Sequence, residues 1–308
     1  MTTASAPGKI ILVGEHAVVY GRPAIAVPIA KVKATVTVEE AARGAGCVIV
    51  ASDLGRTIRV AEAASDDPLA AIVRLTLAHF RVQDLDATIT IKSTIPIASG
   101  MGSGAAVSTA IARALAAHLG FTLNNDVLSG LVFETEKLYH GTPSGVDNTV
   151  IAHARPVFFV RNRLIENFAV KSPLHLLIAD TGISSPTKAT VADVRKAWEA
   201  DQEKYDAWFR QIGQIALMAR AAIIAGEHSA LGSLMDGNQW LLEQVGVSSP
   251  EIDRLVQAAR RGGALGAKLS GAGRGGNIVA LTTEQTQDGI TDILRDAGAK
   301  SVIAATIT

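Results

Sequence analysis

The feature that most constrains how this chain folds is a glycine-rich loop. It runs directly into a long helix of small apolar residues. The loop covers residues 99–104 (SGMGSG), and the expected helix continues to about Leu119. Glycines let a loop backbone approach a ligand closely, and the first turn of a helix presents unpaired N–H groups at the positive end of its dipole. The pattern predicts an anion site, most often one for phosphate. A tight turn before a buried helix is the alternative explanation.

The same loop also fits the spacing of a dinucleotide-binding motif through Gly100, Gly102 and Ala105. We reject this interpretation because the preceding strand stops near Ser93 and no acidic residue ends a second strand about twenty positions later. A second glycine run, residues 271–276, precedes a strand instead of a helix. The phosphate loop of P-loop kinases and the motifs of protein kinases are absent from the sequence.

The composition fits a globular protein whose overall charge is balanced. The chain has 308 residues, 48% of them hydrophobic and 19% charged, and its formal net charge is zero. This balance argues against nucleic acid or a membrane surface as the main partner. The single cysteine, Cys47, excludes an internal disulfide framework and fits a reducing, cytoplasmic location. We expect neither a signal peptide nor a membrane-spanning segment.

Apolar patterns predict strands and helices in both halves of the chain. We expect strands over residues 9–13, 24–29, 31–39, 47–51, 57–60, 87–92, 156–160, 164–170, 174–180, 267–269, 277–281 and 301–306, and helices over residues 68–80, 125–140, 285–297 and much of 187–261. This mixture of hairpins and helices predicts two α+β domains instead of one doubly wound sheet. We place the boundary near Lys171, which gives domains 1–171 and 172–308.

Two further stretches carry residues suited to catalysis. In residues 5–16 (SAPGKIILVGEH), Lys9 opens an apolar strand, where a charge needs an anionic partner or ligand, and Glu15 and His16 follow the strand. In residues 134–148, a helix carrying Glu136 ends near Gly141, and a tight turn then presents Asp147. A carboxylate at Asp147 is able to accept a proton from a hydroxyl, and Glu136 is able to bind a hard cation.

Each of these residues also has an ordinary structural explanation. Lys9 is then a solvated lysine at a strand end, His16 a structural histidine, Glu136 part of a solvated helix face, and Asp147 a turn residue. The remaining histidines, at 79, 118, 153, 175 and 228, show no spacing typical of metal ligands, and we expect each to be structural.

Four stretches together resemble the GHMP small-molecule kinases, and within that family the members that phosphorylate mevalonate. They are residues 6–29 (APGKIILVGEHAVVYGRPAIAVPI), 95–108 (IPIASGMGSGAAVS), 140–148 (HGTPSGVDN) and 268–281 (KLSGAGRGGNIVAL). Residues 235–248 are also similar to the C-terminal half of those enzymes. The resemblance implies a two-domain α+β GHMP kinase fold with the active site in the cleft between the domains. It also implies Mg²⁺-dependent phosphoryl transfer from ATP to the C5 hydroxyl of mevalonate.

The resemblance assigns roles to individual residues. It implies Lys9 and Asp147 as the catalytic pair, with Glu136 and Ser103 as metal ligands. Either Asp147 removes the hydroxyl proton while Lys9 stabilises the alkoxide, or catalysis is mainly positioning and the proton leaves late. The residues implied for ATP are Pro96, Gly100, Met101, Gly102, Ser103, Gly104, Ala105 and Ala106, and those implied for mevalonate are Glu15, His16, Thr187, Gly271 and Ala272.

Three positions depart from the family pattern. Gly104 stands where the family has a serine that binds magnesium, so that Ser103 or water must supply the missing oxygen. Met101 replaces a leucine. Arg274 replaces a glycine, either as an added phosphate contact or as an exposed side chain, and the loop must differ locally if that position needs a positive φ.

Two other functions stay open at this point. One is a GHMP kinase for another acceptor, such as a mevalonate phosphate or a sugar, and the other is a non-catalytic sensor that only binds its ligand. We expect ATP and mevalonate as partners, no nucleic acid and no membrane, with a homodimer left open.

Overall fold

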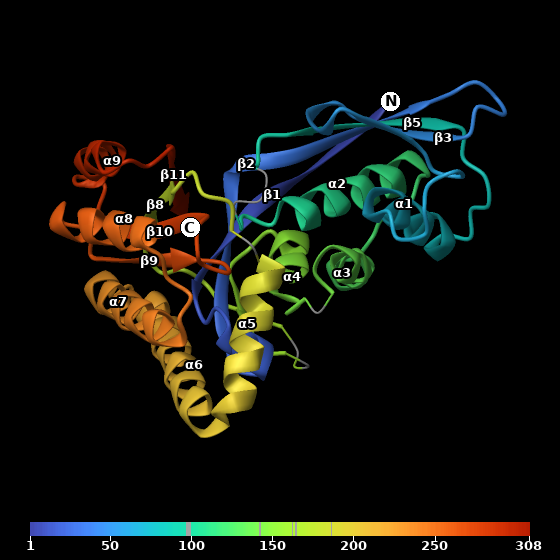
Figure 1. Cartoon of the computed structure of the whole chain (residues 1–308). Coiled ribbons are helices and arrows are strands. Elements are labelled where there is room, and N and C mark those ends of the chain that lie inside the picture. Colours follow the sequence, from blue (N-terminus) through green and yellow to red (C-terminus); the bar gives the residue numbers. More distant parts are fainter. Residues whose placement is uncertain (97–99, 142, 162, 164, 186) are drawn as a thin grey trace. The chain divides into compact units, whose positions relative to one another are not determined.

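The computed structural model describes residues 1–308 except for 97–99, 142, 162, 164 and 186 (Figure 1). Parts of our predictions for the glycine loop, the 142–147 turn, the 164–170 strand and the cap at Pro186 therefore lie outside the described residues. The chain forms two compact units. Unit 1 comprises Met1–Gly8, Val32–Pro96 and Gly102–Ala154, and unit 2 comprises Lys9–Lys31, Ile97–Met101 and Arg155–Thr308. Lys171 lies inside the last segment of unit 2, and the domain boundary there stays a prediction.

Unit 1 combines strands with a group of helices. Its elements are β3 (Cys47–Ala51), η2 (Ser52–Leu54), β4 (Arg56–Arg59), α1 (Pro68–His79), β5 (Ala87–Ser93), α2 (Ser103–His118), α3 (Asn125–His140) and α4 (Val146–His153), with parts of β1 (Thr2–Val13) and β2 (Ala24–Glu40). The strands follow the order β4-β3-β5-β2, in which only the β3–β5 pair is parallel. Figure 1 shows α1 and α2 on one side of β3 and β5, and α2 packs against β5.

Local sequence signals explain most of these elements. Asp67 caps α1, because its side chain accepts hydrogen bonds from Leu69 N and Ala70 N, each at 3.0 Å. In β2, Val32, Val36 and Val38 are buried, as the alternating pattern predicts. The expected break between strands 24–29 and 31–39 is wrong, because β2 is continuous. The alternation changes phase at two successive exposed residues, 30 and 31, while the backbone stays extended.

Helix α4 corrects a second expectation. We expected a tight turn that presents Asp147 and assigned no helix after it, whereas Asp147 lies in the first turn of α4. Gly145, with φ 93°, ends the turn and caps the helix. The buried side chains of α4, among them Val150 and Ile151, pack toward α2 and α3.

Unit 2 is built around a four-stranded antiparallel sheet covered by helices. Its elements are η1 (Ala17–Tyr20), β6 (Val157–Phe159), β7 (Glu166–Asn167), β8 (Leu174–Asp180), α5 (Thr187–Ala200), α6 (Gln202–Ala225), α7 (His228–Val245), α8 (Pro250–Arg261), β9 (Gly266–Ser270), β10 (Asn277–Thr282), α9 (Gln287–Asp296) and β11 (Ser301–Ile307), with the remaining parts of β1 and β2. The sheet has the order β11-β8-β10-β9. Helices α7, α8 and α9 pack against it, and Phe209, Leu241 and Ile278 belong to the core between them.

The second, smaller strand group of unit 2 pairs β6 with Ala24–Ala26 of β2 and with β7. The expected strand over residues 164–170 is wrong in length, because β7 contains only Glu166 and Asn167. Both units mix helices with mainly antiparallel strands, which confirms the predicted α+β class. None of the described helices combines the length and apolar character that crossing a bilayer requires.

Candidate active site

Residues 5–16, here called the first motif, contain the end of strand β1 and a sharp turn that only glycine allows. Gly14 has φ 104°, and a Cβ at this position would lie 2.5 Å from the Cα of Ala24. The chain then passes through Glu15 and His16 into η1. His16 itself has φ 59° and ψ −52°, a positive-φ conformation that is uncommon for a residue with a side chain. Residues 14–16, here called the acceptor loop, are therefore held in one unusual backbone path.

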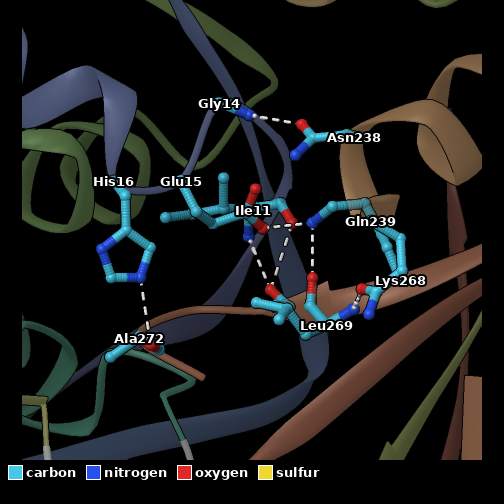
Figure 2. A network of polar contacts seen from close by, with 10 residues as sticks. Ile11, Gly14, Glu15, His16, Asn238, Gln239, Lys268, Leu269 and Ala272 are labelled. Atoms are coloured by element: carbon cyan, nitrogen blue, oxygen red, sulfur yellow. Dashed lines mark hydrogen bonds and ion pairs between the residues drawn. The ribbon is translucent and has the colours of Figure 1, made fainter. Parts of the chain in front are cut away.

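Hydrogen bonds tie the first motif to α7 and to residues 268–277, here called the third motif (Figure 2). The N–H of Gly14 donates to Asn238 Oδ1 at 3.0 Å. The N–H of Leu269 donates to Gln239 Oε1 at 2.8 Å. The hydroxyl of Ser270 accepts from Ile11 N and donates to Ile11 O, both at 3.1 Å. Neighbouring residues of α7 thus hold the end of β1 and the strand β9, although sequence analysis assigned no role to either.

His16 is buried, and its imidazole points at the backbone of the third motif (Figure 2). Its Nε2 lies 3.0 Å from the carbonyl oxygen of Ala272. Because a carbonyl oxygen only accepts hydrogen bonds, we assign the proton to Nε2. Burial lowers the pKa of His16 to about 4, and the positive charges of Arg274 and Lys268 act in the same direction. The ring is therefore neutral near pH 7, with Nδ1 as a hydrogen-bond acceptor.

Glu15 forms an ion pair with Lys268 in the interior of unit 2. The carboxylate is 1% exposed and the ammonium group 0% exposed, and Lys268 also donates to the carbonyl of Leu269. Burial raises the pKa of Glu15 and lowers that of Lys268, and the mutual attraction of the two groups opposes both shifts. Sequence analysis missed Lys268. The signal was present, because a lysine within an apolar strand needs an anionic partner, as argued for Lys9; Lys9 itself lies inside β1, which begins at Thr2, and not at the start of a strand as expected.

The start of the glycine loop lies beside the third motif within unit 2. The N–H of Lys9, a residue 3% exposed, donates to Met101 O at 3.0 Å. A Cβ built on Gly100 would lie 3.6 Å from Ser270 O and 3.9 Å from the Cα of Gly271. Lys9, Gly100, Met101 and Gly271, predicted from three separate motifs, are thus brought together.

Helix α5 begins close to the glycine loop of the third motif, residues 271–276. The N–H of Thr187 donates to Ser185 O at 2.9 Å, and the hydroxyl of Ser185 donates to Gly273 O at 2.8 Å. Arg274 has a positive φ of 54°. Its guanidinium pairs with Asp193 of α5, and its N–H donates to Val247 O at 2.8 Å. The arginine thus accepts a positive φ at this position and links the loop to α5.

Unit 1 carries the predicted phosphate site at the start of α2. Gly102, with φ 72°, is the N-cap and supplies no side-chain hydrogen bond to the first turn. Glu136 of α3 is 2% exposed and faces this helix start, because a Cβ built on Gly104 would lie 3.3 Å from Glu136 Oε1. The same Cβ would lie 3.1 Å from Cε2 of Tyr139. The aromatic ring of Tyr139 therefore occupies the space beside the residue that lacks a side chain.

Asp147 is half-buried in the first turn of α4, where the helix dipole stabilises a negative charge. The next two residues fix this helix. Asn148 Nδ2 donates to Ser129 O at 3.1 Å and to Ser129 Oγ at 2.9 Å, and Thr149 Oγ1 donates to Gly145 O at 2.6 Å. Asn148 and Thr149 hold α4 and thereby Asp147.

Each unit carries one part of the predicted site, and each part is described by itself. Unit 1 contains Pro96, Gly102, Ser103, Gly104, Ala105, Ala106, Glu136 and Asp147, and unit 2 contains Lys9, Glu15, His16, Gly100, Met101, Thr187, Gly271 and Ala272. The catalytic pair Lys9 and Asp147 is divided between the units, so its pairing stays a prediction.

Comparison with known proteins identifies the family. The GHMP kinases N terminal domain matches residues 68–154, and the GHMP kinases C terminal domain matches residues 219–300. Mevalonate kinase of Aeropyrum pernix is 38% identical over 91% of this chain and 88% of its own length, and that of Pyrococcus furiosus is 34% identical over 97% and 94%. The crystal structure of L. major mevalonate kinase in complex with R-mevalonate has a TM-score of 0.84 at 30% identity, covering 100% of this chain and 96% of that chain.

Both matched domains place the fold in the GHMP kinase class. The relatives are similar over nearly the whole chain and share one activity by name. The chain belongs to the mevalonate kinase family of GHMP kinases.

Proposed function

We propose that the chain transfers the γ-phosphoryl group of ATP to the C5 hydroxyl of mevalonate. The geometry of the acceptor loop is the main observation behind this proposal. His16 is held on Ala272 at 3.0 Å with a neutral ring, which leaves Nδ1 as an acceptor for a substrate hydroxyl. A relative of 30% identity and full coverage has been crystallised with R-mevalonate, which supports the same acceptor here.

We assign the chemistry to Lys9 and Asp147. Asp147 accepts the proton of the acceptor hydroxyl, and the ammonium group of Lys9 stabilises the negative charge that develops on the oxygen. Lys9 suits this role because it is 3% exposed, so its charge acts with little screening by water. Asp147 suits it because α4 is fixed by Asn148 and Thr149. Positioning alone, with late proton loss, is the competing mechanism.

The start of α2 suits the phosphates of ATP, because its first-turn N–H groups have no side-chain cap. Mg²⁺ fits beside it. Glu136 offers a buried carboxylate facing this helix start, and Ser103 opens the helix. Among the described residues no three His, Cys, Asp or Glu side chains cluster, which agrees with an ion held by few protein ligands and by substrate phosphates. When bound, Mg²⁺ neutralises charge on the phosphates.

An assay of ATP consumption with several acceptors tests the function. We expect turnover with mevalonate, and ³¹P NMR should identify the product as a phosphate monoester on C5. Phosphomevalonate and galactose serve as competing acceptors. Turnover with one of these and not with mevalonate would assign another acceptor, and binding of mevalonate without turnover would assign a sensor.

Location and assembly complete the proposal. We propose a cytoplasmic enzyme, since the sequence has a single cysteine. Light scattering after size-exclusion chromatography distinguishes a monomer from the homodimer that the sequence analysis leaves open.

A further inference from the structure

Lys268 is a buried lysine to which the mechanism above assigns no role. It lies in β9, directly before the glycine loop of the third motif, and its side chain is 0% exposed. Taking an ammonium ion out of water costs several kcal/mol unless a partner compensates. The compensation comes from Glu15, which lies 253 residues away in the sequence, and from the carbonyl of Leu269.

Glu15 is the middle residue of the acceptor loop. Each of the three loop residues has a polar contact with a residue far away in the sequence. Gly14 is held through its N–H by Asn238, Glu15 through its carboxylate by Lys268, and His16 through its imidazole by Ala272 (Figure 2). A strained positive-φ conformation at a residue such as His16 persists only where the surroundings impose it.

We propose that Lys268 is a positioning residue for the acceptor: its ion pair with Glu15 fixes the acceptor loop and thereby the direction of the His16 imidazole. This inference rests on the proposed function, in which His16 contacts mevalonate. Glu15 then acts through the loop and not through contact with mevalonate.

The charges around the loop predict a pH signature. Glu15 faces Lys268 of β9 and, with weaker effect, Lys9 of β1, while Arg274 and Lys268 act on His16. Burial already raises the pKa of Glu15 and Lys268 opposes that shift. In Lys268→Met the main opposing charge is gone, so the pKa of the Glu15 carboxyl should rise further, and at high pH an ionised carboxylate would be buried without its partner.

The experiment compares wild type, Lys268→Met, Glu15→Gln/Lys268→Met and, as a control, Lys92→Met, which removes an exposed strand lysine. We expect Lys268→Met to raise KM for mevalonate by about tenfold to a hundredfold, with KM for ATP within about twofold of wild type. The rise should be larger at pH 9 than at pH 6, and Glu15→Gln in the same chain should remove this pH dependence. A purely structural role would lower the active fraction for both substrates and leave both KM values unchanged.

The outcomes separate the inference from the function on which it rests. Wild-type turnover with an unchanged KM for mevalonate in folded Lys268→Met overturns the inference alone. Absence of mevalonate turnover in wild type overturns the proposed function, and the acceptor role of the loop falls with it. If Lys268→Met does not fold, the double variant replaces it, because that variant buries no charge. A raised KM for mevalonate in the double variant supports the inference, and a wild-type KM overturns it.

Discussion

The absent side chain at Gly104 and the ring of Tyr139 form a coupled pair whose energetics can be measured. We predict that Gly104→Ser destabilises the protein while Tyr139 is present and stabilises it once Tyr139 is replaced by alanine. Gly104 is not among the residues with positive φ, so its backbone accepts a Cβ. Steric crowding opposes the substitution, since that Cβ would lie 3.1 and 3.2 Å from two ring atoms of Tyr139 and 3.3 Å from Glu136 Oε1.

The expected magnitude follows from two opposing effects. Serine is a better helix former than glycine by about 0.5 kcal/mol, which favours the substitution in the first turn of α2. Overpacking costs about 1–3 kcal/mol where neighbours cannot move. Gly104→Ser alone should therefore lower the free energy of unfolding by about 0.5–2.5 kcal/mol. In Tyr139→Ala the crowding is removed and the helix gain remains, so the coupling energy between the two sites should be about 1–3 kcal/mol.

Urea unfolding of wild type, both single variants and the double variant measures this coupling. Gly130→Ser is the matched control, because Gly130 lies in α3 with nothing within 4 Å of its Cβ position. It should show the helix gain alone. The same proteins are then assayed for rate against free Mg²⁺ at saturating ATP. In the double variant the new hydroxyl stands near Glu136, and the Mg²⁺ concentration for half-maximal rate should fall. Additive stabilities would refute the steric argument.

Three further predictions concern the catalytic pair and the acceptor loop. Asp147→Asn should lower kcat by at least about a hundredfold with ATP affinity near wild type, and near-normal turnover would remove Asp147 from the chemistry. Lys9→Met should impair turnover more than folding, since Ile10 and Leu12 supply the burial of β1; a wild-type kcat/KM together with an unchanged melting temperature would exclude its catalytic role. Because the pKa of His16 falls from 6.5 to about 4 on folding, the unfolded chain binds more protons between these values. The resulting stability, about 3 kcal/mol, is present above pH 6.5 and lost as the pH falls through 4, and His16→Gln should flatten this part of the urea-derived profile. Parallel profiles would contradict that assignment.

Elements with strong local signals could be predicted from the sequence. The helix expected over residues 125–140 matches α3, because Asn124 caps its start through Val127 N at 2.8 Å and Gly141 ends it. The strand expected over residues 174–180 matches β8, in which Leu174 and residues 176–179 are buried. Helix α4 was missed because it is short and follows a Pro-Ser-Gly turn, so that Asp147 looked like a turn residue. Local patterns are weakest where a helix begins without a side-chain cap.

Long-range partners could not be predicted, even where the need for one was visible. Lys9 lies within β1 and Lys268 within β9, each followed by or set among apolar residues, and the same physical argument demands an anionic group for each. For Lys268 that group is Glu15, but a single sequence says nothing of which carboxylate, 253 residues away, will face it. Arg274 presents the same problem, because its positive φ is a property of the loop while its partner Asp193 belongs to α5. The sequence can indicate that a buried charge needs a partner, but only the fold shows which group is that partner. The pair Glu15–Lys268 therefore marks the acceptor loop as a feature of tertiary structure, whose failure under substitution should appear in KM for the acceptor before it appears in the folding of unit 2.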